Sequence, residues 1–397
     1  MKKVKFGIIG IGNMGTSHLK NILDGNCPEL DVVAVADVNE ERLTVAKEMV
    51  AKAKETNPEI SDVATYTDAT EMLKAGVIEA VLVAVPHYDH PRYVIEALQN
   101  NVHAMCEKPA GVYTEQVKEM IAEADKHKDL VFGMMFNQRT NSYFKKMREL
   151  VQNGEIGNIR RTNWIITNWY RAQAYYDSGS WRATWSGEGG GVLLNQCPHN
   201  LDLWQWICGM PCKVDAKLHY GKWHNIEVED DVTAYVEYPN GATGTFVTST
   251  GDVPGSNRFE ITGDKGKLVF DNGKLTLTKL AMSEPEFSKT NKIPFGWPEM
   301  ETVEVEVVQE GKQHIEILNR FAAAILRGED LVADGREGIN GLTISNAMHL
   351  SSWLGKPVEL PFDEKLYKEE LMKRVATSRR KENVVSVVAD TSATYNS

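Results

Sequence analysis

Three polar residues near the middle of the chain have types and spacings that could support proton transfer. Asn195, His199 and Asp202 lie at i, i+4 and i+7, so a helix starting near Val192 would present all three on one face. Histidine, with an ordinary pKa near 6.5, can accept the proton of a hydroxyl group during oxidation. The glycines at 189–191 predict a place where a ligand approaches the backbone. The helix alone leaves a structural and a catalytic His199 equally open.

Lys108 is a second candidate for chemistry. It lies in Glu107-Lys108-Pro109, directly after a strand predicted over 102–106. Ligands of open α/β sheets bind at the carboxyl ends of the strands, and a proline that stops a helix follows the lysine. We therefore expect a functional lysine, whose ammonium group hydrogen-bonds a reacting hydroxyl and stabilises negative charge on its oxygen. The alternative is an ordinary surface lysine.

A glycine-rich loop near the N-terminus predicts a dinucleotide site. The pattern G-x-G-x-x-G directly follows a predicted strand and opens a predicted helix. The first glycine permits the tight turn, the second a close approach to pyrophosphate, and the third close packing of helix on strand. Backbone N–H groups at the helix start favour a phosphate anion. The residues expected to contact the cofactor here are Gly10, Gly12, Asn13, Met14 and Gly15.

The cofactor is predicted to be NAD because an acidic residue ends the second strand. Asp37 lies 22 residues after Gly15, where a carboxylate accepts hydrogen bonds from ribose hydroxyls and repels a 2′-phosphate. The next residues, Val38 and Asn39, bring no positive charge beside it. An N-cap role for Asp37 is compatible with the same position.

The elements that must position these residues form two predicted domains. In residues 1–136, short apolar runs alternate with helical patterns, which is typical of a Rossmann-type parallel sheet covered on both faces. In residues 137–362, alternating strands joined by short turns predict an α/β domain with an open, mainly antiparallel sheet. Residues 363–397 are expected to be a tail, although the segment from Asn383 could also be an arm laid on a neighbouring subunit.

The predicted elements follow from these patterns. In the first domain, strands are expected at 3–9, 32–36, 80–85, 102–106 and 130–135, and helices at 14–23, 40–54, 90–99 and 114–127. In the second, strands are expected at 233–238, 243–250, 259–262, 267–270, 275–280 and 302–308, and helices at 142–152, from 192, at 314–326 and at 341–354.

Composition narrows the class of protein. The chain has 397 residues, 44 Lys plus Arg and 55 Asp plus Glu, so its net charge of −11 argues against a general nucleic-acid surface. With 42% hydrophobic residues it can build real cores. Five cysteines fit a reducing cytoplasm better than a disulfide framework. No segment is long and apolar enough for a signal peptide or a membrane span, so we expect a cytoplasmic protein.

The order of these motifs resembles the glucose–fructose oxidoreductase/inositol dehydrogenase/MocA (Gfo/Idh/MocA) family over roughly residues 3–361. The resemblance implies that Lys108 is the motif lysine and His199 the catalytic histidine. It also implies that Pro86 and His90, from a Pro-x-x-x-His turn, lie at the cofactor with Glu107. Where many members carry Asp, this chain has Asn195, which cannot hold a charge; Asp202 could orient His199 instead. The family further implies oligomerisation through the open sheet.

An aromatic stretch indicates the substrate. Seven aromatic residues lie between Trp164 and Trp185, where the average content of 8% predicts about two. Rings pack on the C–H faces of sugars, while Tyr and Arg donors bind the hydroxyl groups. About half of the rings should be core. The residues expected to line a sugar pocket are Tyr175, Trp181 and Arg182, together with Asn195 and His199.

The sequence therefore predicts an NAD-dependent dehydrogenase of a secondary hydroxyl on a sugar or glycoside, with C3 of a glucoside favoured through the resemblance. Alternatives are a redox-neutral glycosidase acting through a 3-keto intermediate, an inositol dehydrogenase, and a non-catalytic NAD-binding regulator. No metal site is expected, because Cys208 and Cys212 have no second pair. The acidic run 227–231 is expected to be a solvated strand entry.

Overall fold

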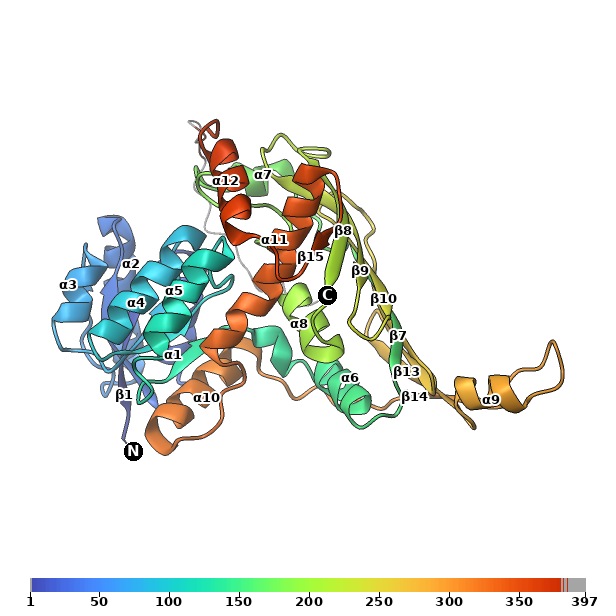
Figure 1. Ribbon diagram of the computed structural model, residues 1–397. Coiled ribbons are helices and arrows are strands. Elements are labelled where there is room, and N and C mark those ends of the chain that lie inside the picture. Colours follow the sequence, from blue (N-terminus) through green and yellow to red (C-terminus); the bar gives the residue numbers. More distant parts are fainter. Residues whose placement is uncertain (1, 380, 382–383, 385–397) are drawn as a thin grey trace. The chain divides into compact units, whose positions relative to one another are not determined.

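The computed structural model describes residues 2–379, 381 and 384, which form two compact units (Figure 1). The first unit contains residues 2–140 and 312–342. The second contains residues 141–311 and the described residues from 343 onward. The predicted first domain therefore gains a segment from late in the chain.

The first unit is built on a six-stranded sheet in the order β3-β2-β1-β4-β5-β6, and every neighbouring pair is parallel. This is the strand order of a Rossmann fold. All four residues of β4 are buried, because helices cover both faces of such a sheet. The strands are β1 (Val4–Ile9), β2 (Leu30–Ala36), β3 (Ala64–Tyr66), β4 (Ala80–Val83), β5 (His103–Cys106) and β6 (Phe132–Met134).

The helices of this unit follow the predicted alternation with the strands. Asn39 and Asp68 cap the second and third helices through side-chain hydrogen bonds to backbone N–H groups. The short strand β3 and the third helix were not predicted, because neither has a long apolar pattern. The helices are α1 (Asn13–Leu23), α2 (Glu40–Thr56), α3 (Ala69–Lys74), α4 (His90–Gln99) and α5 (Thr114–Ala124).

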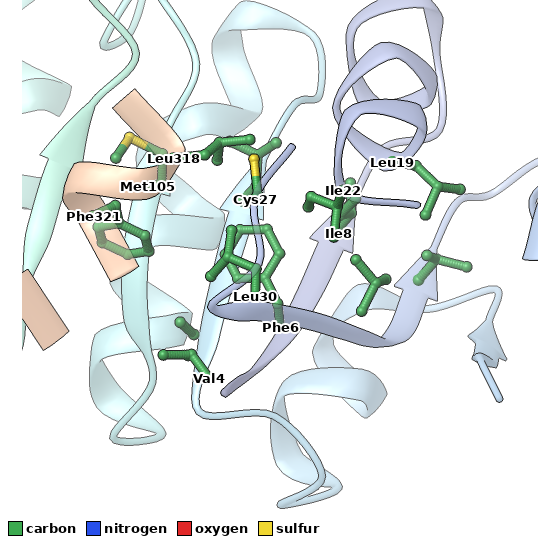
Figure 2. Close-up of a cluster of buried hydrophobic side chains, with 14 of the residues drawn as sticks. Val4, Phe6, Ile8, Leu19, Ile22, Cys27, Leu30, Met105, Leu318 and Phe321 are labelled. Atoms are coloured by element: carbon green, nitrogen blue, oxygen red, sulfur yellow. The ribbon is translucent and has the colours of Figure 1, made fainter. Parts of the chain in front are cut away.

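Helix α10 (Gln313–Arg327) belongs to the first unit, whereas the sequence placed it in the second domain. Figure 2 shows Leu318 and Phe321 of this helix in the same buried cluster as Phe6 of β1. The Phe6 and Phe321 rings meet edge to face, with centroids 6.4 Å apart. An apolar face shows that a helix is buried, but it does not show against which sheet.

The second unit is built on a nine-stranded sheet in the order β14-β13-β12-β11-β7-β10-β9-β8-β15. Among these strands, the pairing of β7 with β10 is parallel and the other pairings are antiparallel. The strands β7, β8 and β15 were not predicted. The strands are β7 (Ile159–Ile166), β8 (Lys213–Tyr220), β9 (Glu229–Glu237), β10 (Thr243–Ser249), β11 (Asn257–Gly263), β12 (Gly266–Asp271), β13 (Lys274–Leu280), β14 (Met300–Glu304) and β15 (Val358–Glu359).

Among the residues that the structure describes, helices cover one face of this sheet and leave the other open. Helices α6 (Ser142–Gln152), α8 (Pro198–Cys208) and α11 (Gly338–Leu354) lie on the same side of it in Figure 1. The burial of β9 alternates from Asp231 to Glu237, as expected for such a sheet. On the open face, Ile165 and Tyr235 are exposed among threonines and charged residues. That face therefore carries both apolar and polar side chains.

Segments expected to be irregular are partly helical. Helix α7 (Gln173–Tyr176) is one turn within the aromatic stretch, and α9 (Glu284–Thr290) lies between β13 and β14. Helix α12 (Glu364–Val375) replaces the beginning of the predicted tail, and it buries Tyr367 and Leu371. Asp363 caps it by accepting hydrogen bonds from the next turn. The question of a tail or an arm falls almost entirely outside the described residues. No described helix combines the length and the apolar character that crossing a membrane requires.

We predict that Phe321→Ala lowers the free energy of unfolding by about 3–5 kcal/mol, because it leaves a cavity against β1. The matched control is Phe295→Ala, at a ring that is 92% exposed and should cost less than about 0.5 kcal/mol. Urea unfolding of both variants measures the difference. Equal stabilities would contradict the assignment of α10 to the core of the first unit.

Candidate active site

The glycine loop has the geometry that each of its three glycines was expected to provide. Gly10 has a φ of +91° at the turn after β1. A Cβ atom on Gly15 would lie 1.8 Å from the carbonyl oxygen of Gly10, so only glycine permits this contact between α1 and the loop. By contrast, a Cβ atom on Gly12 would meet no atom within 4 Å. Gly12 is therefore dispensable for packing and borders open space.

The first turn of α1 is suited to an anion. Gly12 is the N-cap residue, no side chain caps the helix, and its first turn, which begins with Asn13 and Met14, contains no acidic residue. The N–H groups of such a turn and the helix dipole favour a phosphate group. Together with the open space at Gly12, this arrangement fits the pyrophosphate of a dinucleotide.

Asp37 holds the glycine loop from the end of β2. It is 8% exposed, and its Oδ2 accepts a hydrogen bond from the N–H of Ile11 at 2.7 Å. Its Oδ1 accepts one from the N–H of Asn39 at 2.9 Å. Two carboxylate oxygens have about four acceptor positions, so the group can also accept hydrogen bonds from ribose hydroxyls.

Helix α2 brings a positive charge to Asp37 that the neighbouring residues lack. The Nη1 atom of Arg42 lies 3.6 Å from Oδ2 of Asp37. The prediction of an uncharged neighbourhood rested on Val38 and Asn39, which directly follow Asp37. Arg42 lies one helical turn further on, and its side chain is half exposed. The carboxylate remains the group closest to the glycine loop, which agrees with NAD as the cofactor.

A buried acidic residue holds the backbone of Lys108. Oε2 of Glu107 accepts a hydrogen bond from the N–H of Lys108 at 3.1 Å, and Oε1 lies 2.6 Å from Nε2 of His18 in α1. His314 of α10 meets the ring of His18 edge to face. Burial raises the pKa of Glu107. The hydrogen bond from His18 and the electrostatic effects of His18, His314 and Lys108 outweigh burial and lower this pKa to about 2.

His90 fixes the other side of the same loop. It opens α4 after the turn that begins at Pro86, and its Nδ1 donates a hydrogen bond to the carbonyl oxygen of Pro109 at 2.6 Å. Burial lowers the pKa of His90, so the ring is held neutral. The structure thus brings together His90, Glu107 and Lys108, which the sequence predicted separately.

His199 lies on a shorter helix than the sequence predicted. Helix α8 begins at Pro198, and residues 192–197 form turns. Proline has no N–H to donate to the preceding turn and is favoured at the first position of a helix, which explains the late start. His199 is 2% exposed in the first turn, with Asp202 on the same helix. Asn195 precedes α8, so the prediction of one helical face for all three residues is wrong.

The residues that surround Asn195 form a polar cluster, defined here as Tyr175, Arg182, Glu188, Asn195 and Gln196. The hydroxyl of Tyr175 donates to Oδ1 of Asn195 at 3.2 Å. It accepts from Nη1 of Arg182 at 2.9 Å and from Nε2 of Gln196 at 3.2 Å. The amide Nδ2 of Asn195 donates to Oε1 of Glu188. Glu188 and Gln196 were not predicted, because their residue types give no distinctive signal in the sequence.

Glu229 holds the turns that carry this cluster, although the acidic run 227–231 was expected to be solvated. It is fully buried, and its carboxylate accepts hydrogen bonds from the N–H groups of Gly191 and Leu193 at 2.8–3.0 Å. Its Oε2 also lies 3.0 Å from Nε2 of His349 in α11. A Cβ atom on Gly191 would lie 2.0 Å from the carbonyl oxygen of Glu229. The glycine at position 191 therefore permits close packing on β9 rather than a close ligand.

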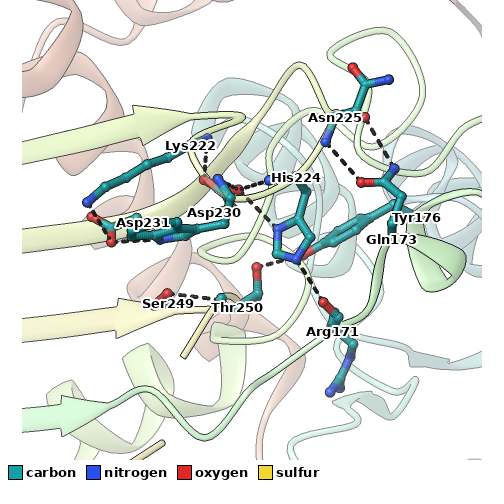
Figure 3. A network of polar contacts seen from close by, with 12 residues as sticks. Arg171, Gln173, Tyr176, Lys222, His224, Asn225, Asp230, Asp231, Ser249 and Thr250 are labelled. Carbon is teal, nitrogen blue, oxygen red and sulfur yellow. Dashed lines mark hydrogen bonds and ion pairs between the residues drawn. The ribbon is translucent and has the colours of Figure 1, made fainter. Parts of the chain in front are cut away.

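Asp230 holds the aromatic stretch in place. Figure 3 shows its buried carboxylate accepting hydrogen bonds from the loop after β8, including from His224 Nδ1 at 3.0 Å. Nε2 of His224 donates to the carbonyl oxygen of Arg171 at 2.8 Å, and the Tyr176 ring packs on His224. The hydroxyl of Tyr176 donates to Thr250 at 2.7 Å. Residues 171–176, which include Tyr175, are thus fixed by buried polar contacts.

The seven aromatic residues divide between core and surface. The buried rings are Trp164, Trp169, Tyr176 and Trp185. Tyr170 is exposed, and Tyr175 and Trp181 are half-buried. The Arg182 guanidinium lies over both of the half-buried rings, at 4.6 Å and 4.8 Å from their centroids. Arg182 therefore contacts both Tyr175 and Trp181, which were predicted with it to line a sugar pocket.

Asp202 has a local partner on α8. It is 1% exposed, and its Oδ1 accepts a hydrogen bond from Nε2 of Gln205 at 3.1 Å. Its proposed orientation of His199 stays a prediction. Among the described residues, no three His, Cys, Asp or Glu side chains form a group that could hold a metal ion.

Comparison with known proteins agrees with the two-unit fold. Residues 4–134 match the model of the oxidoreductase family with an NAD-binding Rossmann fold, and residues 144–269 match the C-terminal domain of the same GFO/IDH/MocA family. Myo-inositol 2-dehydrogenase of Thermotoga maritima is 28% identical over 70% of this chain and 78% of its own length. Levoglucosan dehydrogenase of Pseudarthrobacter phenanthrenivorans is 26% identical over 68% of this chain and 74% of its own length.

The WlbA dehydrogenase from Chromobacterium violaceum has been solved in complex with NADH and UDP-GlcNAcA. The matched region covers 91% of this chain and 97% of the WlbA chain. Its TM-score is 0.75 and its identity 26%. The chain thus belongs to the Gfo/Idh/MocA family of oxidoreductases. It is an NAD-dependent oxidoreductase that acts on hydroxyl groups.

We predict that Gly12→Ala weakens NADH binding at least tenfold and leaves the melting temperature nearly unchanged, because the new methyl group enters only the open space of the phosphate site. Gly15→Ala is the matched comparison and should destabilise the protein strongly, because its methyl group has no room. Fluorescence titration and thermal melting measure the two effects. Unchanged NADH affinity in Gly12→Ala would refute this site.

We predict that His314 makes the protein less stable as the pH falls from 7 to 5. Burial and the nearby charges of His18 and Lys108 lower the pKa of His314 to about 4, against the opposing effect of Glu107. Below its ordinary pKa of about 6.5, the unfolded chain therefore binds a proton that the folded chain does not. The free energy of unfolding should fall by at most about 1.4 kcal/mol per pH unit from this group.

His314→Asn removes this titration, so urea unfolding should show a shallower pH dependence between pH 7 and 5 than in the wild type. His127→Asn is the control, at a partly exposed histidine on the surface. A steeper or identical dependence in the His314 variant would show that the sign is wrong.

Proposed function

We propose that the protein oxidises a secondary hydroxyl group of a sugar or glycoside to a ketone with NAD as the acceptor, and that C3 of a glucoside is the favoured position. The observation that carries the proposal is the polar cluster around Tyr175, which leads directly into the turn and helix of His199. Its half-buried rings and its hydroxyl, amide and guanidinium groups suit the C–H faces and the hydroxyls of a sugar. The relatives named for inositol and levoglucosan support this class of substrate.

In the proposed mechanism, NAD, when bound, supplies the acceptor for the electrons of the C–H bond. Lys108 hydrogen-bonds the reacting hydroxyl as an ammonium group and stabilises the negative charge that develops on its oxygen. His199 accepts the hydroxyl proton. The orientation of these groups is assigned to Asn195 or, in its place, to Asp202. Substrate binding is assigned to Tyr175, Trp181 and Arg182.

The proposed cofactor residues lie in the glycine loop and in the loop after β5. Their support is the open space at Gly12, the carboxylate at Asp37 and the contacts among His90, Glu107 and Lys108. The full set is Gly10, Gly12, Asn13, Met14, Gly15, Asp37, Pro86, His90, Glu107 and Lys108.

We also infer a cytoplasmic homo-oligomer without a nucleic-acid or membrane partner. The support is the net charge of −11, the five cysteines free of disulfides, and the uncovered sheet face of the second unit. Light scattering of the purified protein distinguishes an oligomer from a monomer. A monomer at micromolar concentration would exclude an assembly through that face.

We predict that Lys108→Ala lowers kcat about 10²–10⁴-fold, because the lysine side chain acts on the developing oxyanion. The NADH dissociation constant should stay within about threefold of the wild type, because alanine keeps the backbone N–H that Glu107 holds in the cofactor loop. Lys126→Ala, at an exposed lysine of the same unit, is the control. Steady-state kinetics and fluorescence titration supply the two readouts. Unchanged kcat in Lys108→Ala would remove the lysine from the mechanism.

Absorbance at 340 nm with NAD and a panel of glucosides, free sugars, inositols and sugar nucleotides tests the function. The proposal expects stoichiometric NADH with a glucoside or another sugar. NADH from inositol alone would instead assign inositol dehydrogenation. Release of the aglycone without net NADH would indicate the redox-neutral glycosidase. The absence of a reaction with every panel member would instead favour a non-catalytic NAD-binding regulator.

A further inference from the structure

Glu188 is a buried acidic residue that the proposed mechanism does not use. It is 2% exposed and lies between the one-turn helix α7 and the turns that carry Asn195. Its two oxygens have separate partners: Oε2 accepts a hydrogen bond from the N–H of Ala183 at 2.6 Å, and Oε1 accepts one from Nδ2 of Asn195. A carboxyl group with this burial and these two contacts is fixed in place.

The contacts of Asn195 determine which way its amide points. Oδ1 accepts the hydroxyl proton of Tyr175, so Nδ2 must face Glu188. Glu188 offers only acceptors when it is ionised, so the reversed amide would place two oxygens against each other. The direction of every hydrogen bond from Arg182 through Tyr175 to Asn195 therefore depends on the carboxylate at position 188.

Asn195 carries no charge, but its amide is hydrogen-bonded to the carboxyl group of Glu188. Asparagine cannot hold the negative charge that an aspartate at this position would bring near His199. We propose that Glu188 supplies this carboxyl group through Asn195 and is a positioning residue for the polar cluster and the proton-transfer reaction. The inference rests on the proposed function, because Asn195 and His199 are assigned there.

The surroundings of Glu188 make its charge sensitive to substitution. Burial raises its pKa, with Glu229 acting in the same direction. The charge of Arg182, the N–H of Ala183 and the amide of Asn195 oppose this effect. A second carboxyl group at position 195 would lie in direct contact with Glu188, and the two could not both ionise at an ordinary pH.

The test uses three variants of the full-length protein: Glu188→Gln, Asn195→Asp, and the two substitutions combined. Glu188→Gln should lower kcat at least tenfold with little change in the KM for NAD. Asn195→Asp should move the acid limb of the kcat–pH profile to higher pH, because the carboxyl pair holds a proton. The combined variant again has one carboxyl and one amide, so its profile should return toward that of the wild type and its kcat should exceed that of Glu188→Gln.

Glu227→Gln is the matched control. Its carboxylate accepts hydrogen bonds in the same region, from the N–H of Trp185, the hydroxyl of Ser378 and the N–H of Arg379. It should leave kcat and the pH profile unchanged. A wild-type kcat and profile in Glu188→Gln would overturn the inference. An unshifted profile in Asn195→Asp, or a combined variant no better than Glu188→Gln, would also overturn it.

Thermal melting separates this inference from the proposed function. The contact predicts that Asn195→Asp lowers the melting temperature, because the buried carboxyl pair is tolerated only with a bound proton, and that the combined variant recovers it. If no panel substrate reacts while the combined variant recovers the melting temperature, the proposed function fails and the coupling of Glu188 with Asn195 stands. If the wild type turns over and neither the kinetics nor the melting shows coupling, this inference alone fails.

Discussion

The contact between the glycine loop and the start of α1 is the constraint on which the cofactor half of the structure depends. Gly15 packs so closely on the carbonyl oxygen of Gly10 that no side chain fits, and this contact places the first turn of α1 directly after β1. Asp37 reinforces it by binding the N–H of Ile11 from the end of the next strand. The open space at Gly12 follows from this geometry, and it is where a phosphate group can reach the backbone.

The second unit uses buried carboxylates for a comparable purpose. Glu229 holds the turn at Gly191, Asp230 holds the loop of His224, and Glu188 holds Asn195. Each accepts hydrogen bonds from groups that would otherwise be buried without partners, which is costly. Loops that carry substrate-binding side chains are thereby fixed by polar contacts rather than by regular secondary structure.

Local pattern predicted the first unit well and the second unit less completely. Continuous apolar strands such as β4, and the capped helix α2, have signals within a few residues of sequence. The strand β7 has long polar side chains on its open face and escaped prediction, although it is central to its sheet. The attachment of α10 to β1 depends on contacts about 300 residues apart, which periodicity does not encode.

The candidate site shows the same limit. Gly10, Gly12 and Gly15 could be found because one loop dictates their spacing, and Asp37 because it directly follows the next strand. Glu188, Gln196 and Glu229 could not be found, because an isolated acidic or amide residue in a sequence is expected to be solvated until its partners are known. The helix was predicted to begin near 192, but it begins at Pro198, because this proline has no N–H to donate to the preceding turn.

The central claim is that a C–H bond of a sugar carbon is broken and its hydrogen is carried to NAD. The most direct measurement uses the best substrate of the panel with deuterium at the carbon that becomes the ketone, followed by mass spectrometry of the isolated NADH. The account predicts one deuterium in each NADH formed. NADH without deuterium, formed at the normal rate, would contradict it.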